Sequence, residues 1–248
     1  MLKLEGVSKK YKGADQFAVQ DLNLEVRPGE IFGFLGPNGA GKTTTIKMIV
    51  GLLEADQGKI TVNGYDVAKD PVQAKHSIGF VPDNPNLYQR LTGLEYLNLI
   101  GDVFGVDGPT RSKRLDYYLE MFQLTKAAGD LIQSYSHGMQ QKLALTGALL
   151  HAPALFILDE PMVGLDPKSA HLFKEIMREH VEQGNTVFFS THILEVAEKL
   201  CDRVGIISQG QLIACGTMDE LRHDSRKADL SLERLFLELT EDGGNHDE

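Results

Sequence analysis

The chain has 248 residues and a formal net charge of −10. That length fits one large domain or a core with an inserted subdomain, and the acidic balance argues against a nucleic-acid surface, which normally shows clustered Lys and Arg. Two cysteines, Cys201 and Cys215, lack metal or disulfide spacing and favour a reducing compartment. The most apolar stretch, residues 144–158, is interrupted by His151 and Pro153, short of the ~20 residues of a spanning helix. We also find no N-terminal signal, so we expect any membrane association to depend on a partner.

The first fifty residues predict strands around two loops. A polar loop that carries Tyr11 separates two alternating runs, which predict half-buried strands. A short apolar strand over residues 31–35 follows the turn at Pro28-Gly29 and leads into Gly36. The alternating apolar residues are Leu2, Leu4, Leu22, Leu24 and Val26. An amphipathic helix after the glycine loop is predicted from Ile46, Ile49, Val50 and Leu53.

The middle of the chain changes from strands to helices. Asn63-Gly64 predicts a hairpin turn, and residues 78–81 predict another strand. From residue 94 to residue 150 the apolar spacing is helical, and no strand run competes with it. The clearest helical stripe consists of Leu115, Tyr118, Leu119 and Phe122. We therefore expect a helical subdomain, at about residues 88–152, inserted in an α/β protein.

Strands and helices alternate again after Pro153, which predicts a largely parallel sheet. Residues 155–158 and 186–189 have the continuous apolar character of buried strands. The helix between them is marked by Leu172, Phe173, Ile176 and Met177. Thr217 and Glu220 form a possible capping box, and a final amphipathic helix is indicated by Leu232, Leu235, Phe236 and Leu239. We expect one domain over residues 1–240 and a disordered acidic tail over residues 241–248.

A phosphate-binding loop is predicted where the strand over residues 31–35 ends. GPNGAGKT fits G-x-x-x-x-G-K-[ST] in full, after a strand and before a helix. Its N–H groups would surround phosphates, Lys42 would reach the β and γ oxygens, and the Thr43 hydroxyl would ligate Mg²⁺. The alternative is a glycine turn with a lysine nearby. The expected nucleotide-binding residues here are Gly36, Pro37, Asn38, Gly39, Ala40, Gly41, Lys42, Thr43 and Thr44.

Two further strands end in polar residues that suit a nucleotide site. LFILDEP places Asp159, a candidate Mg²⁺ ligand through water, beside Glu160, a candidate base for the attacking water. His192 follows a buried strand in FFSTH, where its N–H could stabilise charge on the γ-phosphate. Taken singly, the carboxylates could form a solvated acidic turn and the histidine could be a packed or surface residue.

The stretch YSHGMQQKLALTGALL, residues 135–150, predicts a helix whose N-terminus is bare. Such an N-terminus is a potential anion site, with Ser136 as a hydroxyl donor and with N–H groups near Gly138 and Met139. The alternative is that Ser136 is a simple N-cap.

The order of these motifs resembles the ATPase domain of ABC transporters over nearly the whole chain. Tyr11, otherwise an ordinary exposed aromatic, matches the adenine-stacking residue, and His192 matches the switch histidine. Residues 36–43 match the Walker A loop, 157–160 the end of Walker B, 135–139 the signature motif and 163–166 the D-loop, which contributes Asp166 to nucleotide binding.

Two positions differ from the commonest pattern of that family. Asp83 stands where glutamine is frequent, and it can meet Mg²⁺ as a hard oxygen ligand. His137 and Met139 replace a glycine and a glutamine of the signature, and Y-S-x-G-M looks like the variant found in ATPase subunits of ABC-2 type exporters.

The resemblance implies a P-loop NTPase core with a mainly parallel sheet, an N-terminal antiparallel β region and an inserted α-helical subdomain. It implies an ATPase that uses ATP and Mg²⁺, with Glu160, His192 and Lys42 as catalytic residues. Two subunits pack head to tail in that family, so the signature residues of one would cap the γ-phosphate held by the other. Such a subunit is cytoplasmic and lies at the inner face of the cell membrane through an integral membrane permease.

Three alternatives share parts of this pattern. A soluble ABC ATPase that remodels a protein complex would have the same catalytic site and a different partner. A nucleotide-gated scaffold with little turnover is disfavoured because Glu160 and His192 are both present. A DNA-repair ATPase is disfavoured because the sequence has neither a long coiled-coil insertion nor a basic stripe.

Overall fold

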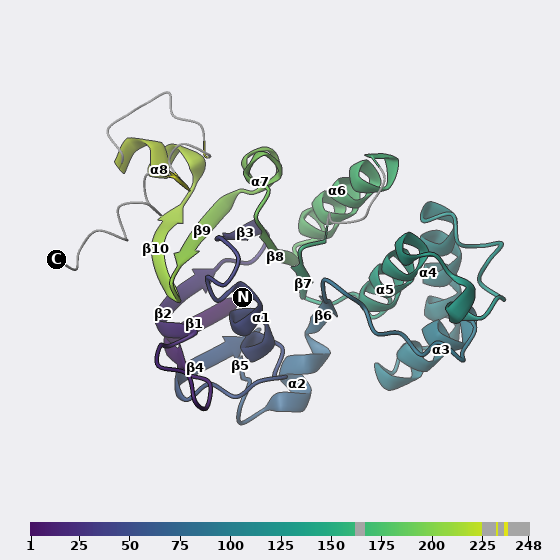
Figure 1. The fold of residues 1–248 in the computed structure, drawn as a ribbon. Coiled ribbons are helices and arrows are strands. Elements are labelled where there is room, and N and C mark those ends of the chain that lie inside the picture. The colour runs from purple at the N-terminus through teal and green to yellow at the C-terminus, as the bar shows by residue number, and fades with distance from the viewer. Residues whose placement is uncertain (162–166, 225–231, 233–235, 238–248) are drawn as a thin grey trace.

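The strands of the protein form two sheets (Figure 1). The structure is a computed structural model that describes residues 1–161, 167–224, 232 and 236–237. The smaller sheet is antiparallel, has the order β2-β1-β4-β5, and consists of β1 (Leu2–Lys9), β2 (Val19–Val26), β4 (Gln57–Val62) and β5 (Tyr65–Asp66). This is the N-terminal antiparallel region that the family resemblance implied. Asn63 and Gly64 both have positive φ in the β4–β5 turn, as a two-residue hairpin requires.

The larger sheet has six strands in the order β10-β9-β3-β8-β7-β6. Its neighbours pair in parallel, except that β10 runs antiparallel to β9. Its strands are β3 (Ile31–Leu35), β6 (Ile78–Val81), β7 (Leu155–Asp159), β8 (Thr186–Thr191), β9 (Arg203–Ser208) and β10 (Gln211–Gly216). Because β3, β7 and β8 are neighbours, the residues that follow their carboxyl ends meet at one edge of the sheet.

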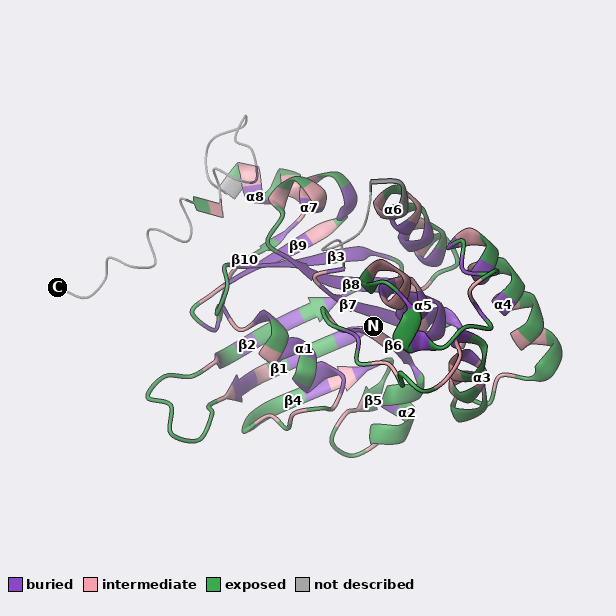
Figure 2. Ribbon diagram, turned by 45° about the vertical axis from the view of Figure 1, so that its right-hand side comes forward, coloured by how far each residue is buried: buried purple, intermediate pink, exposed green. Residues whose placement is uncertain are grey.

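Helices cover the larger sheet and extend beyond it. The core helices are α1 (Lys42–Ile49), α2 (Pro71–His76), α6 (Pro167–Glu182), α7 (Leu194–Leu200) and α8 (Met218–Asp224). The chain between β6 and β7 forms α3 (Gly93–Val103), α4 (Gly108–Met121), the 3₁₀ turn η1 (Ile132–Ser134) and α5 (His137–Leu149). Figures 1 and 2 show α3, α4 and α5 together at the end of the molecule next to the edge strand β6. This is the inserted helical subdomain that the sequence predicted, and its limits at residues 88 and 152 stay a prediction.

Two hydrophobic cores lie on opposite faces of the six-stranded sheet, which Figure 2 shows as mostly buried. Side chains alternate along each strand, so Phe188 packs with α1 and the antiparallel sheet, while Val187 and Phe189 pack with the helices on the other face. Phe188 lies between Phe32 and Phe34, with ring centroids 5.8 and 5.4 Å away. Both faces of the sheet are therefore covered, as continuous apolar strands require.

The β9–β10 hairpin is the main element that the sequence patterns did not predict. Its turn contains Gly210, whose N–H donates to Ala40 O at 3.0 Å and whose carbonyl accepts from Gln20 N at 2.9 Å. The hairpin thus joins the predicted phosphate loop to β2. The short apolar run of β9 is interrupted by Gly205, which weakens its periodicity. The helices α2 and α7 were also not predicted.

Several predicted boundaries can be compared with the structure. The helix after the glycine loop is shorter than predicted: α1 ends at Ile49, and Leu53 lies beyond it, because the chain turns at Gly51 with φ +68. The capping box is confirmed, since Thr217 N donates to Glu220 Oε2 at 2.7 Å and Glu220 N donates to Thr217 Oγ1 at 3.2 Å.

The predicted last helix and tail are described only in part. Leu232 and Phe236 are helical and pack with the core that contains α8, whereas Leu235 and Leu239 lie outside the described residues. The tail predicted over residues 241–248 also lies outside the described residues.

Candidate nucleotide-binding site

The loop between β3 and α1 is tightly packed against its surroundings. Gly41 has φ +108, and a Cβ there would lie 2.5 Å from Ala18 O. A Cβ at Gly36 would lie 2.5 Å from Ile207 O, at the end of β9. Neither contact is possible for a side chain, so the glycines of the sequence motif allow β3 to turn directly into α1. The turn leaves the N-terminus of α1 open to a phosphate.

Lys42 lies inside this loop, with 7% of its side chain exposed. Its Nζ donates to Gly36 O at 2.7 Å and to Pro37 O at 3.3 Å, and it lies 3.7 Å from Glu160 Oε1. The ammonium group therefore occupies the position from which it can neutralise anionic oxygen on the loop.

Thr43 and Asp159 meet across the sheet edge. Thr43 Oγ1 donates to Asp159 Oδ2 at 3.0 Å, and Ser190 Oγ donates to Asp159 Oδ1 at 2.6 Å. The sequence patterns did not select Ser190, although it is a polar residue in a buried strand two positions before His192. The Asp159 carboxylate, which is 4% exposed, thus has a hydrogen bond on each oxygen.

Glu160 and His192 form a pair at the mouth of the loop. Glu160 Oε2 lies 3.0 Å from His192 Nδ1. An ionised carboxylate can only accept, so Nδ1 carries a proton in this arrangement. Nε2 can then donate a hydrogen bond only if the imidazole is protonated. The predicted hydrogen bond from His192 to a phosphate therefore requires the imidazolium form or a turned ring.

The phosphate loop, Asp159 and Glu160 border a cleft of about 260 Å³. It is lined by Ala18, Pro37, Asn38, Gly39, Gly41, Lys42, Thr43, Thr44, Asp83, Asp159 and Glu160. Of the predicted loop residues, Gly36 and Ala40 do not line it; they position the loop through the contacts with Ile207 and Gly210 described above. Asp83 is exposed and lines the cleft with Asp159 and Glu160, so the structure brings the predicted metal ligands together with Lys42 and Glu160. His192 does not line the cleft but contacts Glu160.

The charges of the cleft fit a nucleotide that arrives with a cation. Lys42 faces three carboxylates there, which would repel a bare triphosphate. Thr43 and Asp159 supply hard oxygen atoms of the kind that Mg²⁺ prefers. Within the described part of the chain, no group of three or more His, Cys, Asp or Glu residues could hold a metal alone. The residues present therefore fit Mg²⁺ shared with phosphate oxygens, which is its usual mode of binding.

Tyr11 lies beside the loop rather than in the cleft. The residue is 44% exposed, and its hydroxyl lies 3.3 Å from Thr44 Oγ1 in α1. An exposed ring next to the phosphate loop is suitably placed for stacking with a base.

The signature residues lie at the N-terminus of α5 and do not line this cleft. Figures 1 and 2 show α1 and α5 well apart in the molecule. The prediction of a bare N-terminus is wrong for Met139, because its N–H donates to Ser136 Oγ at 3.3 Å and Ser136 is the N-cap. The N–H groups of His137 and Gly138 precede the first intrahelical bond, from Gln140 N to Ser136 O, and remain oriented outward. Asp166 lies outside the described residues.

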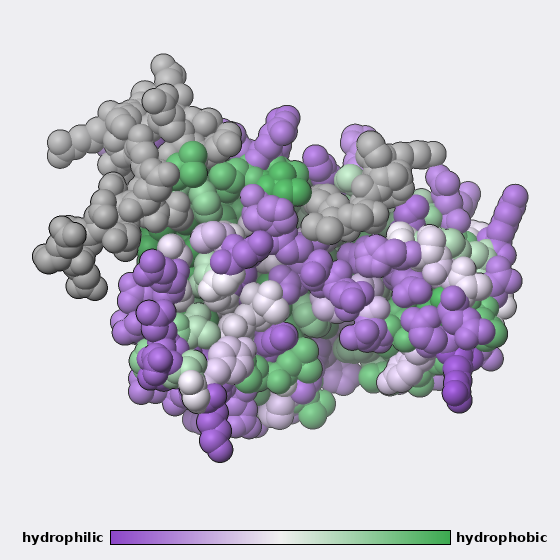
Figure 3. Space-filling model, in the orientation of Figure 1, coloured by the Kyte–Doolittle hydropathy of each residue, from purple (hydrophilic) through white to green (hydrophobic). Residues whose placement is uncertain are grey.

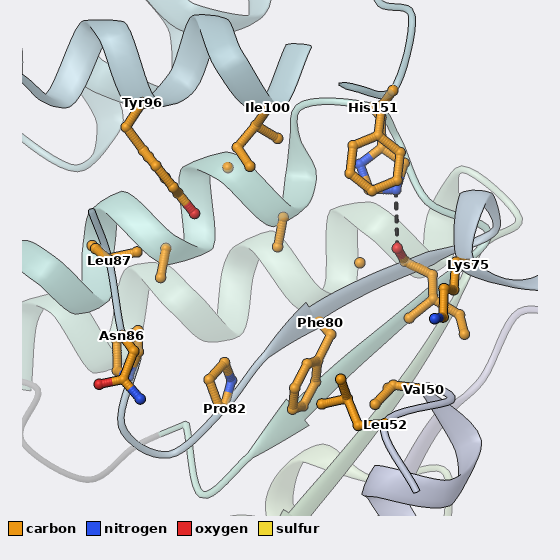
Figure 4. Close-up of a pocket in the computed structure, with 17 residues that line it drawn as sticks. Val50, Leu52, Lys75, Phe80, Pro82, Asn86, Leu87, Tyr96, Ile100 and His151 are labelled. Atoms are coloured by element: carbon orange, nitrogen blue, oxygen red, sulfur yellow. Dashed lines mark hydrogen bonds between the residues drawn. The ribbon is translucent and has the colours of Figure 1, made fainter. Parts of the chain in front are cut away.

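A second cavity, of about 380 Å³, separates the core from the helical insert (Figure 4). It is mostly apolar and is lined by Leu52 and Phe80 of the core, Leu87 of the loop after Asp83, and Ile100 of α3. His151 closes one side: its Nε2 lies 3.1 Å from Ile78 O, and burial lowers its pKa to about 4. The imidazole is therefore neutral at pH 7.

Comparisons with known proteins agree with the fold. A family profile described as "ABC transporter" matches residues 19–163, more than half of the chain. Linearmycin resistance ATP-binding protein LnrL of Bacillus subtilis (strain 168) is 43% identical over 221 residues, which span 89% of this chain and 70% of that protein. A solved structure of an ATP-binding subunit of an ABC transporter matches with a TM-score of 0.93 and 36% identity, over 96% of this chain and 99% of that one.

A further solved structure shows a related cassette after reaction. It is a dimeric ATP-binding cassette in a post-hydrolysis state, bound to ADP and Pi, with a TM-score of 0.80 and 28% identity over 88% of this chain and 99% of that chain. The fold and cleft thus define an ATPase domain of the P-loop class. The chain belongs to the ABC transporter family, and it is an ATP-binding and ATP-hydrolysing domain.

The surface is predominantly hydrophilic on the face that Figure 3 shows, with smaller apolar areas among the polar residues. Among the described residues, no helix combines the length and the apolar character needed to cross a membrane.

Proposed function

We propose that this chain is the ATPase subunit that drives an integral membrane permease, working as a dimer that binds two MgATP between its subunits. The observation that carries the proposal is the convergence of Lys42, Thr43 and Asp159 with Glu160 at one edge of the sheet. This arrangement supports hydrolysis of MgATP to ADP and phosphate.

We assign the residues of the cleft separate roles. The loop N–H groups and Lys42 hold the phosphates and offset negative charge on the leaving side. Thr43 and Asp159 would hold Mg²⁺, Asp159 through water and Asp83 as a further oxygen ligand, and the cation would offset negative charge on the phosphates. Glu160 accepts a proton from the attacking water. His192 orients Glu160 through the 3.0 Å contact between His192 Nδ1 and Glu160 Oε2. The imidazolium form of His192 would also stabilise the γ-phosphate.

The dimer is proposed because each chain carries two separate parts of a phosphate site. The phosphate loop and the α5 N-terminus lie apart in one chain, so one ATP reaches both only if α5 comes from a partner. Ser136 and the N–H groups of His137 and Gly138 would face the γ-phosphate there, with Met139 beside them. The dimeric relative with ADP and Pi supports this assembly.

The apolar cavity beside the Asp83 loop supports contact with the permease. It lies between the core and the helical insert, and Leu52 and Tyr88 near it are 66% and 63% exposed. We propose that these two side chains and the apolar lining of the cavity form one contact surface, since contiguous exposed apolar areas mark interaction sites. A contact here places the chain at the inner face of the cell membrane. The likeness to a resistance ATP-binding protein favours a partner of the ABC-2 exporter type.

Replacing Glu160 by glutamine tests the base. Glu160→Gln keeps the shape of the side chain and removes its basicity, so kcat falls about 100- to 10,000-fold while ATP binding is retained. Phosphate release and nucleotide affinity give the two measurements, and the dimer should accumulate with ATP. The control is Glu182→Gln, which makes the same change at an exposed residue at the end of α6. Unchanged hydrolysis by Glu160→Gln would reject the assignment.

Tyr11 is proposed to stack on adenine. Tyr11→Ala should weaken ATP binding about 5- to 150-fold, as expected for loss of one base–aromatic stack, and should affect inorganic triphosphate far less. Tyr11→Phe keeps the ring and removes only the hydroxyl near Thr44, so it should bind ATP normally. Calorimetry with both ligands measures the difference, and equal losses for ATP and triphosphate would exclude stacking.

Ser136→Arg tests the role of α5 in the partner's site. The long cation blocks the close approach to phosphate, so ATP-dependent dimers should disappear while the monomer binds nucleotide as before. Gln133→Arg adds the same charge at an exposed position just before α5 and should still dimerise. Light scattering with MgATP, with Glu160→Gln added to every variant so that the nucleotide is not consumed, gives the mass of each species. Normal dimers of Ser136→Arg would contradict the proposal.

The permease partner is tested by purification in mild detergent. We expect a multi-spanning membrane protein to co-purify with the wild type and to be lost with Leu52→Glu, which puts a charge into the apolar cavity. Val72→Glu makes the same change at a side chain that is 63% exposed but outside the cavity, and should keep the partner. Mass spectrometry identifies the bound proteins. Recovery of soluble partners alone would favour the complex-remodelling alternative.

A further inference from the structure

Ser190 connects the two carboxylates of the cleft. It lies in β8 beside Asp159 of β7 in the sheet register, and it is fully buried. Its hydroxyl donates to Asp159 Oδ1 at 2.6 Å and accepts from Glu160 N at 3.1 Å. One buried hydroxyl therefore contacts the side chain of one acidic residue and the main chain of the next.

The contact with Asp159 sets the direction of its carboxylate. With Oδ1 held by Ser190, Oδ2 is directed at Thr43, whose Oγ1 lies 3.0 Å away. A buried carboxylate requires hydrogen bonds to remain charged, and bonds to charged groups are the stronger ones. Loss of the Ser190 hydroxyl would leave Oδ1 without this donor and free the carboxylate to rotate away from Thr43.

The contact with Glu160 stabilises an unfavourable backbone conformation. Glu160 has φ +49, in the left-handed region that non-glycine residues seldom adopt. Its N–H donates to both Ser190 O, at 3.2 Å, and Ser190 Oγ. This turn directs the Glu160 carboxylate back towards His192 and Lys42.

We propose that Ser190 is a positioning residue that fixes Asp159 for Mg²⁺ and Glu160 for the attacking water at the same time. The inference rests on the magnesium site and the base proposed above. The proposal gives β8 a second role in the reaction. The strand leads to His192, and it also supplies the hydroxyl that orients Asp159, at the end of β7, and Glu160, which follows it.

Thr186 provides a matched comparison within the same strand. It is also fully buried, but it lies at the opposite end of β8, where its hydroxyl accepts from Gly29 N and donates to Arg27 O, away from the cleft. Removing this hydroxyl should lower stability without changing the cleft. Its variant therefore separates a general effect of losing a buried hydroxyl from an effect on the carboxylates.

The experiment compares Ser190→Thr with Ser190→Val. Both add a branched side chain of nearly equal size, so they share any packing cost, and only threonine keeps the hydroxyl. Ser190→Ala adds no atom and removes the hydroxyl without crowding. We measure Mn²⁺ affinity in the presence of ADP by electron paramagnetic resonance, and kcat and KM for MgATP. Circular dichroism and ADP affinity without metal confirm that each variant is folded.

We expect Ser190→Val and Ser190→Ala to bind Mn²⁺ about 10- to 100-fold more weakly, the effect of one hydrogen bond to a charged group. Their kcat should fall at least as much, with ADP affinity in the absence of metal unchanged. Ser190→Thr should remain within about threefold of the wild type, as should Thr186→Val for Mn²⁺.

Equal Mn²⁺ affinities for the wild type, Ser190→Ala and Ser190→Val would overturn the proposal, and so would failure of Ser190→Thr to restore binding relative to Ser190→Val. A wild-type protein that hydrolyses ATP equally well without a divalent cation would instead overturn the proposed magnesium site.

Discussion

The buried carboxylate of Asp159 is the constraint on which the site depends. It accepts from Thr43 at the start of α1 and from Ser190 in β8 while belonging to β7 itself. Three elements that are distant in the sequence are thereby fixed at one edge of the sheet. A buried charge without these partners would be strongly unfavourable. The charge is thus tolerated because β3, β7 and β8 are neighbours, and this strand order also brings the phosphate loop to the acidic residues.

The charged side chains of the cleft determine which form of a phosphate ligand it favours. Lys42 is held by loop carbonyls and lies near Glu160, while Asp83 and Asp159 add further negative charge. Such a cleft favours a phosphate group that brings its own cation, which links nucleotide binding to the metal. The γ-phosphate would likewise need groups from outside this cleft. The residues that line the described cleft do not include α5, so in the dimer proposed above a second chain would complete the phosphate shell and ATP would promote dimer formation.

The local motifs predicted most of the fold because they depend on short-range chemistry. The glycines at 36 and 41 are required by close backbone contacts, the Asn63-Gly64 turn by its positive φ values, and the Thr217–Glu220 box by hydrogen bonds three residues apart. The β9–β10 hairpin escaped prediction because its role is non-local: Gly210 contacts Ala40, far earlier in the chain. The length of α1 was overestimated because apolar residues after its end still pack into the core.

The sequence by itself determined the chemical groups and the class of site: a complete phosphate loop, two acidic residues after a buried strand, and a histidine after another. These follow from residue types at fixed spacing, which act over a few bonds. Only the tertiary structure decided how they meet. It placed Ser190 against both carboxylates, directed His192 Nδ1 towards Glu160, and capped α5 with Ser136. Those contacts depend on strand order and side-chain orientation, which spacing along the chain does not specify.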